Sequence, residues 1–208
     1  MLFPSLPAQP MDYFEQLYHG QGYRRIAGVD EVGRGPLAGP VVAAAVILPE
    51  EGIGQRLFDS KQIPSPKREA LHEVILSKAL GVGIGVVHQE EIDLLNIFQA
   101  TLKAMALAVE NLPISPDFIL IDGNQPLRLP LPQKTLLKGD RICNSIAAAS
   151  IVAKVTRDRM MMEWHQKFPQ YNFAKHKGYG TKEHRRAIER FGVCELHRKT
   201  FQGVKEYL

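Results

Sequence analysis

The sequence predicts an α/β layer fold in which helices cover a mixed β-sheet. Two apolar runs near the N-terminus, 23–29 and 39–48, flank a glycine-rich loop and are typical of paired buried strands. Helical and strand-like patterns then alternate, and helical patterns dominate from about residue 144 onward. A short apolar run at 117–122, bounded by Gly123, predicts a central buried strand.

A helix is expected to begin at the Ser-Pro pair that follows residue 64. Ser65 is the expected N-cap and Pro66 the first helical residue, because serine and proline are favoured at those positions. Its expected buried face holds three apolar residues at helical spacing: Leu71, Val74 and Ile75. Strict alternation at period two then predicts a strand at 81–87.

The longest helical pattern covers 90–112 and ends before Pro113. Its expected buried side holds six apolar residues: Ile92, Leu95, Phe98, Leu102, Met105 and Leu107. A weaker strand at 133–137 and two further helices, at 144–168 and 181–191, complete the predicted elements.

The composition is typical of a single soluble domain, with 208 residues, 45% of them hydrophobic and 23% charged. Residues 1–20 are expected to form a tail with a short helix, and 21–208 one domain that includes the helical C-terminal part. The longest apolar run, 41–48, is too short to cross a bilayer, and prolines in the first ten residues argue against a signal peptide. Cys143 and Cys194 have no zinc-ligand spacing. A cytoplasmic location with reduced thiols is expected.

Charge is distributed unevenly along the chain. Residues 133–208 contain 16 Lys and Arg against 7 Asp and Glu, whereas residues 1–132 contain 10 against 15. A basic C-terminal third beside an acidic N-terminal part is expected of a polyanion binder that carries its own cation site. A solvated basic surface explains the charge alone equally well.

The segment 28–35 carries the strongest chemical signal. Asp30 and Glu31 follow an apolar run and precede a glycine-flanked arginine, Arg34. Neighbouring residues of a regular strand point to opposite faces, so we expect the backbone to turn here and direct both carboxylates to one cation. Gly33 and Gly35 would let the main chain approach an anionic or sugar ligand closely. The segment therefore indicates chemistry on phosphates.

Two further carboxylates are candidates for the same site. Asp122 ends the predicted central strand, where ligands bind in open α/β sheets, although an Asp-Gly pair also simply caps turns. Asp158 either forms a surface ion pair with Lys154 or projects toward the strand ends from a helix that docks closely through small residues. We favour the projection. Four converging carboxylates would require divalent cations, and an all-oxygen set suits Mg²⁺ or Mn²⁺, with two ions during phosphodiester hydrolysis.

Basic and aromatic residues alternate in two C-terminal segments. The glycine loop at 173–181 contains Lys177 and Tyr179, which suit phosphate contact and stacking on a sugar or base. An ordinary surface loop with Thr181 as a helix cap is the alternative. The second segment, 197–201, is less specific, and Lys61 either reaches a phosphate or is solvated.

Six motifs together resemble the bacterial ribonuclease HII family, in matching order from about residue 23 to 203. They are GVDEVGRGPLAGP at 28–40, IDG at 121–123, KGD at 138–140, AASIVAKVTRD at 148–158, HKGYGT at 176–181 and HRKTF at 197–201. The resemblance implies a ribonuclease H-like fold: a five-stranded mixed sheet flanked by helices, with a C-terminal helical region. About twenty residues precede the first expected strand, which argues against the extra N-terminal domain of the related type III enzyme.

The resemblance also implies an activity and a set of site residues. The activity is endonucleolytic cleavage of RNA in RNA–DNA hybrids and 5′ of single ribonucleotides in duplex DNA, leaving 5′-phosphate and 3′-hydroxyl ends. Asp30, Glu31, Asp122 and Asp158 would be catalytic and bind Mg²⁺ or Mn²⁺. Gly33, Arg34 and Gly35 would sense the ribose 2′-hydroxyl, and Tyr179 would pack on the deoxyribose of the junction. The remaining expected substrate contacts are Lys61, Lys154, Lys177, His197, Arg198 and Lys199.

Two other functions compete with this interpretation. A junction resolvase on a similar fold would have no use for a loop that senses the 2′-hydroxyl. A nucleic-acid-binding protein without catalysis would leave the carboxylates without a role, beside a polyanion that they repel. A monomer is the default expectation for the assembly.

Overall fold

The computed structural model describes residues 10–55, 57 and 64–208. It contains a five-stranded mixed sheet with the strand order β3-β2-β1-β4-β5. The first three strands are antiparallel neighbours, whereas β4 and β5 run parallel to β1. The strands are β1 (Ile26–Val32), β2 (Val41–Ile47), β3 (Gly81–Val87), β4 (Phe118–Asp122) and β5 (Gln133–Leu136). The predicted mixed sheet is therefore confirmed.

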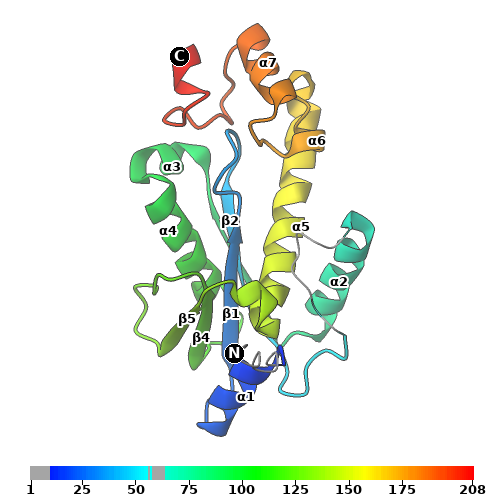
Figure 1. Ribbon diagram of the computed structural model, residues 1–208, viewed down its shortest axis with the longest axis vertical. Coiled ribbons are helices and arrows are strands. Elements are labelled where there is room, and N and C mark those ends of the chain that lie inside the picture. Colours follow the sequence, from blue (N-terminus) through cyan, green and yellow to red (C-terminus); the bar gives the residue numbers. More distant parts are fainter. Residues whose placement is uncertain (1–9, 56, 58–63) are drawn as a thin grey trace, which may run out of the picture.

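Helices cover both faces of this sheet (Figure 1). One face packs against α3 (Gln89–Leu95) and α4 (Ile97–Glu110), and the other against α2 (Ser65–Lys78) and the long α5 (Asn144–Lys167). The chain continues through α6 (Phe173–His176) and α7 (Lys182–Phe191), which lie beyond one end of the sheet in Figure 1. Short 3₁₀ turns occur at Gly139–Arg141, Pro169–Tyr171 and Lys205–Tyr207.

The N-terminal helix α1 (Tyr13–Gly20) is attached to the body of the protein. Tyr18 stacks on Phe118 of β4 with ring centroids 3.9 Å apart. Glu15 accepts hydrogen bonds from the backbone N–H and the hydroxyl of Ser145, at the start of α5. Among the described residues, no helix is both long and apolar enough to span a bilayer.

Glycines in the strands allow the helices to approach the sheet closely. A Cβ on Gly28 of β1 would lie 2.1 Å from the carbonyl carbon of Ser145, so α5 contacts the strand backbone directly. On the opposite face, a Cβ on Gly83 or Gly85 would lie 2.1 or 2.0 Å from a backbone oxygen of α4. This packing explains why α4 buries small residues, among them Ala104 and Ala108.

Three predicted features were wrong in detail. The predicted helix at 90–112 is two helices, because Asn96 has φ +69° and its side chain accepts from the N–H groups of Phe98 and Gln99, which starts α4 anew. Its expected buried side is also wrong in part, since Phe98 is 40% exposed and the alanine face is buried instead. The helix α2 begins at Ser65, so Pro64 and not Ser65 holds the N-cap position.

Candidate active site

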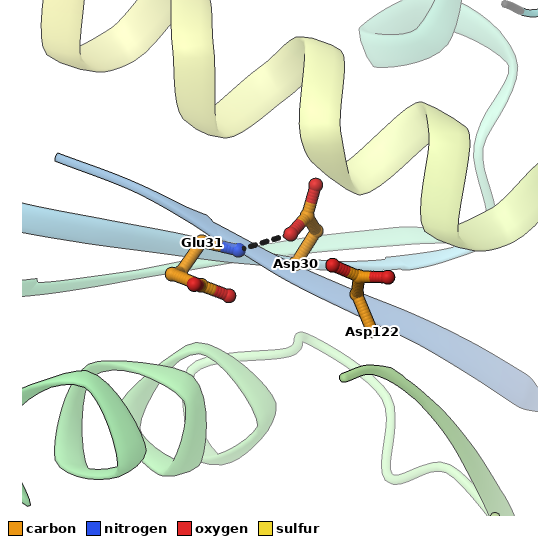
Figure 2. Close-up of side chains that lie close together, drawn as sticks. All are labelled: Asp30, Glu31 and Asp122. Atoms are coloured by element: carbon orange, nitrogen blue, oxygen red, sulfur yellow. Dashed lines mark hydrogen bonds between the residues drawn. The ribbon is translucent and has the colours of Figure 1, made fainter. Parts of the chain in front are cut away.

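Three carboxylates meet at the ends of the two central strands. Asp30 lies on β1 and Asp122 on β4, each one residue beyond the last pair of the parallel register, Val29 with Ile121. One oxygen each of Asp30, Glu31 and Asp122 lies within 4.8 Å of the others. Figure 2 shows the three side chains around one space between α5 and α4.

The expected turn between Asp30 and Glu31 is not present. β1 continues to Val32, and β2 pairs with both carboxylate residues through Ala44 and Ala43. The two side chains therefore leave the strand on opposite faces, as Figure 2 shows. The carboxylates of Asp30 and Glu31 still reach one site because β1 extends past its last pair with β4. Beyond that pair, none of the described strands lies beside β1 on that side, and both side chains can bend toward it.

The carboxylates concentrate negative charge in a partly buried space. Burial raises the pKa of Asp30 well above its usual range, and the charges of Glu31 and Asp122 raise it further. Burial also raises the pKa of Glu31, while the neighbouring Arg34 opposes that shift. Asp30 Oδ1 accepts from the Glu31 N–H at 2.7 Å, and Ser150 of α5 also bonds Asp30. A divalent cation would offset this repulsion, and oxygen ligands suit Mg²⁺ or Mn²⁺.

Asp158 does not join this cluster, contrary to expectation. Its Oδ1 accepts from Lys154 Nζ at 2.7 Å, and its Oδ2 lies 3.5 Å from Arg68 Nη1. Ser150 contacts Asp30, and Asp158 follows it by eight residues, which is roughly 12 Å along the helix. The ion pair that we considered as the alternative is the observed state of Asp158 and Lys154.

Asp140 is a carboxylate that sequence reasoning did not single out. It is 6% exposed and follows Gly139, whose N–H donates to Asp122 Oδ1 at 2.6 Å. Asp140 is thus connected to Asp122 through the backbone hydrogen bond that its neighbour Gly139 donates. The KGD motif at 138–140 is the sequence signal that contains this residue.

The loop after β1 is held in place from within. Gly33 has φ +95°, and a Cβ there would lie 2.3 Å from Arg157 Nε, so only glycine fits. Arg34 is half exposed and its Nη1 lies 3.4 Å from Glu31 Oε1. Gly35 faces Tyr179, whose Cε1 would be 3.9 Å from a Cβ at Gly35. Tyr179 is 42% exposed, so a ligand can reach it beside the glycine loop.

Two of the expected substrate contacts are buried instead. His197 is 1% exposed and bonds His184 and Cys194. Arg198 is fully buried and donates to the carbonyls of Gly33, Arg34 and Gly39. Both residues support the loop and do not present their side chains to a ligand, because their donors are used by internal acceptors.

The other expected lysine contacts have different surroundings. Lys177 is half-buried and donates to the carbonyl of Ala174, and burial lowers its pKa. Lys199 is exposed, and its backbone N–H donates to Asp93 Oδ2 at 2.8 Å. Lys61 lies outside the described residues.

Arg157 is a second buried arginine that sequence reasoning missed. It is fully buried in α5 and donates to the carbonyls of Ala38, Pro40 and Lys177. Burial lowers its pKa to about 10, so it stays charged at neutral pH. Arg157 therefore joins the loop after β1 to the loop that carries Tyr179.

A cleft beside the carboxylates extends toward α4. Glu31, Arg34 and Asp122 line it together with Phe98 and Met105, two residues of the expected buried side of that helix. Phe98 is therefore exposed beside the candidate site, whereas Met105 borders the cleft and is also buried in the core with the glycine-facing alanines.

Sequence comparisons assign the chain to a family. The family model for ribonuclease HII matches residues 27–204. The chain belongs to the ribonuclease HII family. A ribonuclease HII from Syntrophus aciditrophicus is 57% identical over 92% of this chain and 91% of that protein, and one from Syntrophotalea carbinolica is 56% identical over 100% and 99%. Members of the ribonuclease HII family are endoribonucleases that act on the RNA of RNA–DNA hybrids, so this chain is an enzyme of that type.

Solved structures of related proteins have the same fold as this chain. The ribonuclease H2 from Pyrococcus horikoshii superimposes with a TM-score of 0.75 at 26% identity, covering 88% of this chain and 96% of that one. A Bst ribonuclease HIII in complex with Mn²⁺ superimposes with a TM-score of 0.65 at 19% identity, covering 91% and 70%. The predicted ribonuclease H-like fold is confirmed.

Proposed function

We propose that this ribonuclease HII cuts the RNA strand of hybrids and also cuts 5′ of single ribonucleotides embedded in duplex DNA, leaving 5′-phosphate and 3′-hydroxyl ends. The observation that carries the proposal is the juxtaposition of the cluster of Asp30, Glu31 and Asp122 with the Gly33–Gly35 loop and the exposed Tyr179 ring. One part suits phosphodiester chemistry, and the other suits recognition of a sugar.

The carboxylate cluster fits a requirement for Mg²⁺ or Mn²⁺, with two ions during turnover. Asp30, Glu31 and Asp122 would hold the metal, and the raised pKa of Asp30 and of Glu31 indicates a concentration of negative charge that a cation neutralises. Bound ions of this kind activate a water and stabilise the leaving oxygen in phosphodiester hydrolysis. Within the protein, Ser150 and the Gly139 N–H orient Asp30 and Asp122 for that role.

The glycine loop would distinguish ribose from deoxyribose. Peptide groups next to Gly33 and Gly35 can approach a sugar closely, because no Cβ intervenes, and a 2′-hydroxyl can both donate and accept. Arg157 and Arg198 hold this loop from behind through backbone carbonyls. The sensing groups would therefore be pre-positioned, which supports discrimination by a single hydroxyl. Tyr179 would pack on the deoxyribose next to the ribonucleotide.

A cleavage assay tests this proposal directly. One duplex contains a single ribonucleotide, its partner is all DNA, and a third substrate is a uniform RNA–DNA hybrid, each with Mg²⁺, Mn²⁺ or a chelator. We expect metal-dependent cutting 5′ of the ribonucleotide and none of the DNA duplex. Equal cutting of the first two duplexes would reject sensing of the 2′-hydroxyl. Binding of all three without cutting would favour the non-catalytic alternative.

The remaining expectations about this enzyme are part of the same proposal. We propose that 21–208 acts as one catalytic domain, that the enzyme is a monomer, and that it acts in the cytoplasm. Sedimentation of the purified protein with and without a hybrid duplex would test the monomer.

A further inference from the structure

A chain of hydrogen bonds runs through buried histidines to the loop that carries Tyr179. The Cys194 N–H lies 2.9 Å from His197 Nδ1, His197 Nε2 lies 3.1 Å from His184 Nε2, and His184 Nδ1 lies 3.0 Å from the Tyr179 carbonyl oxygen. His184 and His197 are 0% and 1% exposed. No water is needed to complete the chain, because each ring nitrogen faces a protein atom.

The direction of every bond in this chain follows from its first and last members. A backbone N–H can only donate, so His197 Nδ1 accepts from Cys194 and its proton is on Nε2. That Nε2–H then donates to His184 Nε2, which leaves the proton of His184 on Nδ1. A carbonyl can only accept, and Tyr179 O does so from this Nδ1–H. Sequence and geometry thus assign one tautomer to each ring.

Both rings must be neutral for the chain to exist. A proton added to Nε2 of His184 would meet the Nε2–H of His197 at the 3.1 Å contact, and a proton added to Nδ1 of His197 would meet the Cys194 N–H at 2.9 Å. The pKa of both histidines is lowered to about 4, chiefly by burial, and for His184 the nearby His176 and His197 contribute to the shift. His176 stacks on His184 with centroids 4.5 Å apart, and its own pKa is lowered by burial. Neutral rings are therefore the state at physiological pH.

The same short C-terminal segment contacts both loops of the candidate site. His197 pairs with Ala38 across an isolated β-bridge, and the next residue, Arg198, donates to the carbonyls of Gly33 and Arg34. Both residues therefore contact the loop after β1 directly, and His197 reaches the loop of Tyr179 through His184. Tyr179 is itself held by its N–H to the His176 carbonyl, while its ring stays exposed beside Gly35.

We propose that His197 is a positioning residue that acts through His184 to orient Tyr179 against the glycine loop, and thereby sets the preference for RNA–DNA junctions. The proposal rests on the substrate role given to Tyr179 above. In the Nδ1–H tautomer, which is the less common one for a free imidazole, His184 is the donor to the Tyr179 carbonyl. His197 imposes that tautomer by donating to the other nitrogen.

Nitrogen-15 NMR of the full-length protein tests the chain without reference to activity. We expect neutral rings at pH 7, with the proton of His184 on Nδ1 and that of His197 on Nε2. A scalar coupling between the two Nε2 atoms would report their hydrogen bond. A proton on Nε2 of His184, or a charged ring, would overturn the proposal.

Cleavage assays with matched variants test the consequence. His197→Gln keeps an amide N–H near the Nε2 position, whereas His197→Leu removes it at similar volume. We expect His197→Leu to lower the preference for a junction over a uniform hybrid by about tenfold, and His197→Gln to restore most of it. His72→Leu is the control, since His72 is a buried histidine of α2 that bonds Glu73 and lies outside this chain. A comparable loss of junction preference in the control would contradict a specific role.

The double variant separates positioning from general destabilisation. In a Tyr179→Ala background, His197→Leu should cause no further loss of junction preference, because the aromatic ring that His197 helps to orient is absent. An additional loss would overturn the proposal. If Tyr179→Ala alone leaves the preference unchanged, the substrate role of Tyr179 and this positioning role both fail, while the metal-dependent cleavage proposed above stands on its own assay.

Discussion

Arg198 and Arg157 together bind carbonyls at both ends of the same loop. Arg198 donates to Gly33 and Arg34, where the loop leaves β1, and also to Gly39. Arg157 donates to Ala38 and Pro40, where the loop enters β2. Both arginine side chains are fully buried, so their charged groups hold the backbone of this loop and do not contact a ligand directly. A loop held this way presents its outer peptide groups in one conformation.

Arg198→Met should therefore affect both stability and recognition. The substitution leaves three carbonyls without their donor, and each buried unsatisfied group costs about 1–3 kcal/mol. We expect the free energy of unfolding to fall by at least about 2 kcal/mol, and KM for a ribonucleotide-containing duplex to rise. Urea unfolding and steady-state cleavage measure the two effects. Wild-type values for both would show that the loop does not depend on this arginine.

Asp122→Asn should abolish turnover while largely sparing substrate binding. The amide oxygen can still accept from the Gly139 N–H, so the local backbone is retained, but the negative charge that attracts the metal is lost. Cleavage rates and fluorescence anisotropy with a labelled hybrid measure this separation. Near-normal turnover would remove Asp122 from the metal site.

Asp140 and Asp158 compete for the role of a fourth carboxylate. Asp140 is buried and follows Gly139, whose N–H donates to Asp122, whereas Asp158 pairs with Lys154 and Arg68. We expect Asp140→Asn to reduce kcat by at least about 100-fold and Asp158→Asn to reduce it by less than about tenfold, in line with loss of a charged group at the reacting centre. The opposite order would restore the original expectation for Asp158.

Binding of Mg²⁺ should strengthen as the pH rises. Burial and mutual repulsion raise the pKa of Asp30 and Glu31, so without metal the folded protein holds protons that the unfolded chain has released. At pH values between the ordinary carboxyl pKa and these raised pKa values, the free energy of unfolding of the metal-free protein falls as the pH rises. Over the same range the carboxylates carry fewer protons, so a metal ion has fewer protons to displace when it binds. The increase in Tm on adding Mg²⁺ should therefore grow with pH. A pH-independent increase would place the ion elsewhere.

Gly28→Ala should disrupt the contact between α5 and β1. The added methyl would lie 2.1 Å from the Ser145 carbonyl carbon and 2.3 Å from the Ile146 nitrogen, which requires the helix to move. Overpacking of this kind costs about 1–3 kcal/mol or more. Gly20→Ala is the control, because nothing lies within 4 Å of a Cβ at that helical residue. Equal unfolding free energies for the two variants would contradict the close packing.

Local patterns in the sequence predicted most of the elements. Apolar runs predicted β1, β2 and β4, alternation at period two predicted β3, and a weaker pattern indicated β5. Thr181 caps α7 as the sequence indicated, by accepting from the His184 N–H. Asp30, Glu31 and Asp122 were predicted to share a site because each lies near the end of an apolar run, and strand ends meet at one edge of a sheet. These features depend on neighbours along the chain, which a sequence displays directly.

Tertiary structure alone decided what each helix buries and which charged groups are internal. The buried face of α4 is its alanine side, because Gly83 and Gly85 of β3 let the backbones meet, and a pattern within the helix does not reveal that partner. Asp158 pairs with Lys154 two helical turns from the cluster, although its motif suggested convergence. His197 and Arg198 appeared to be surface residues for nucleic acid, yet the fold surrounds them with internal acceptors. Residue type determines which bonds a side chain can form, but only the assembled fold determines which partners it meets.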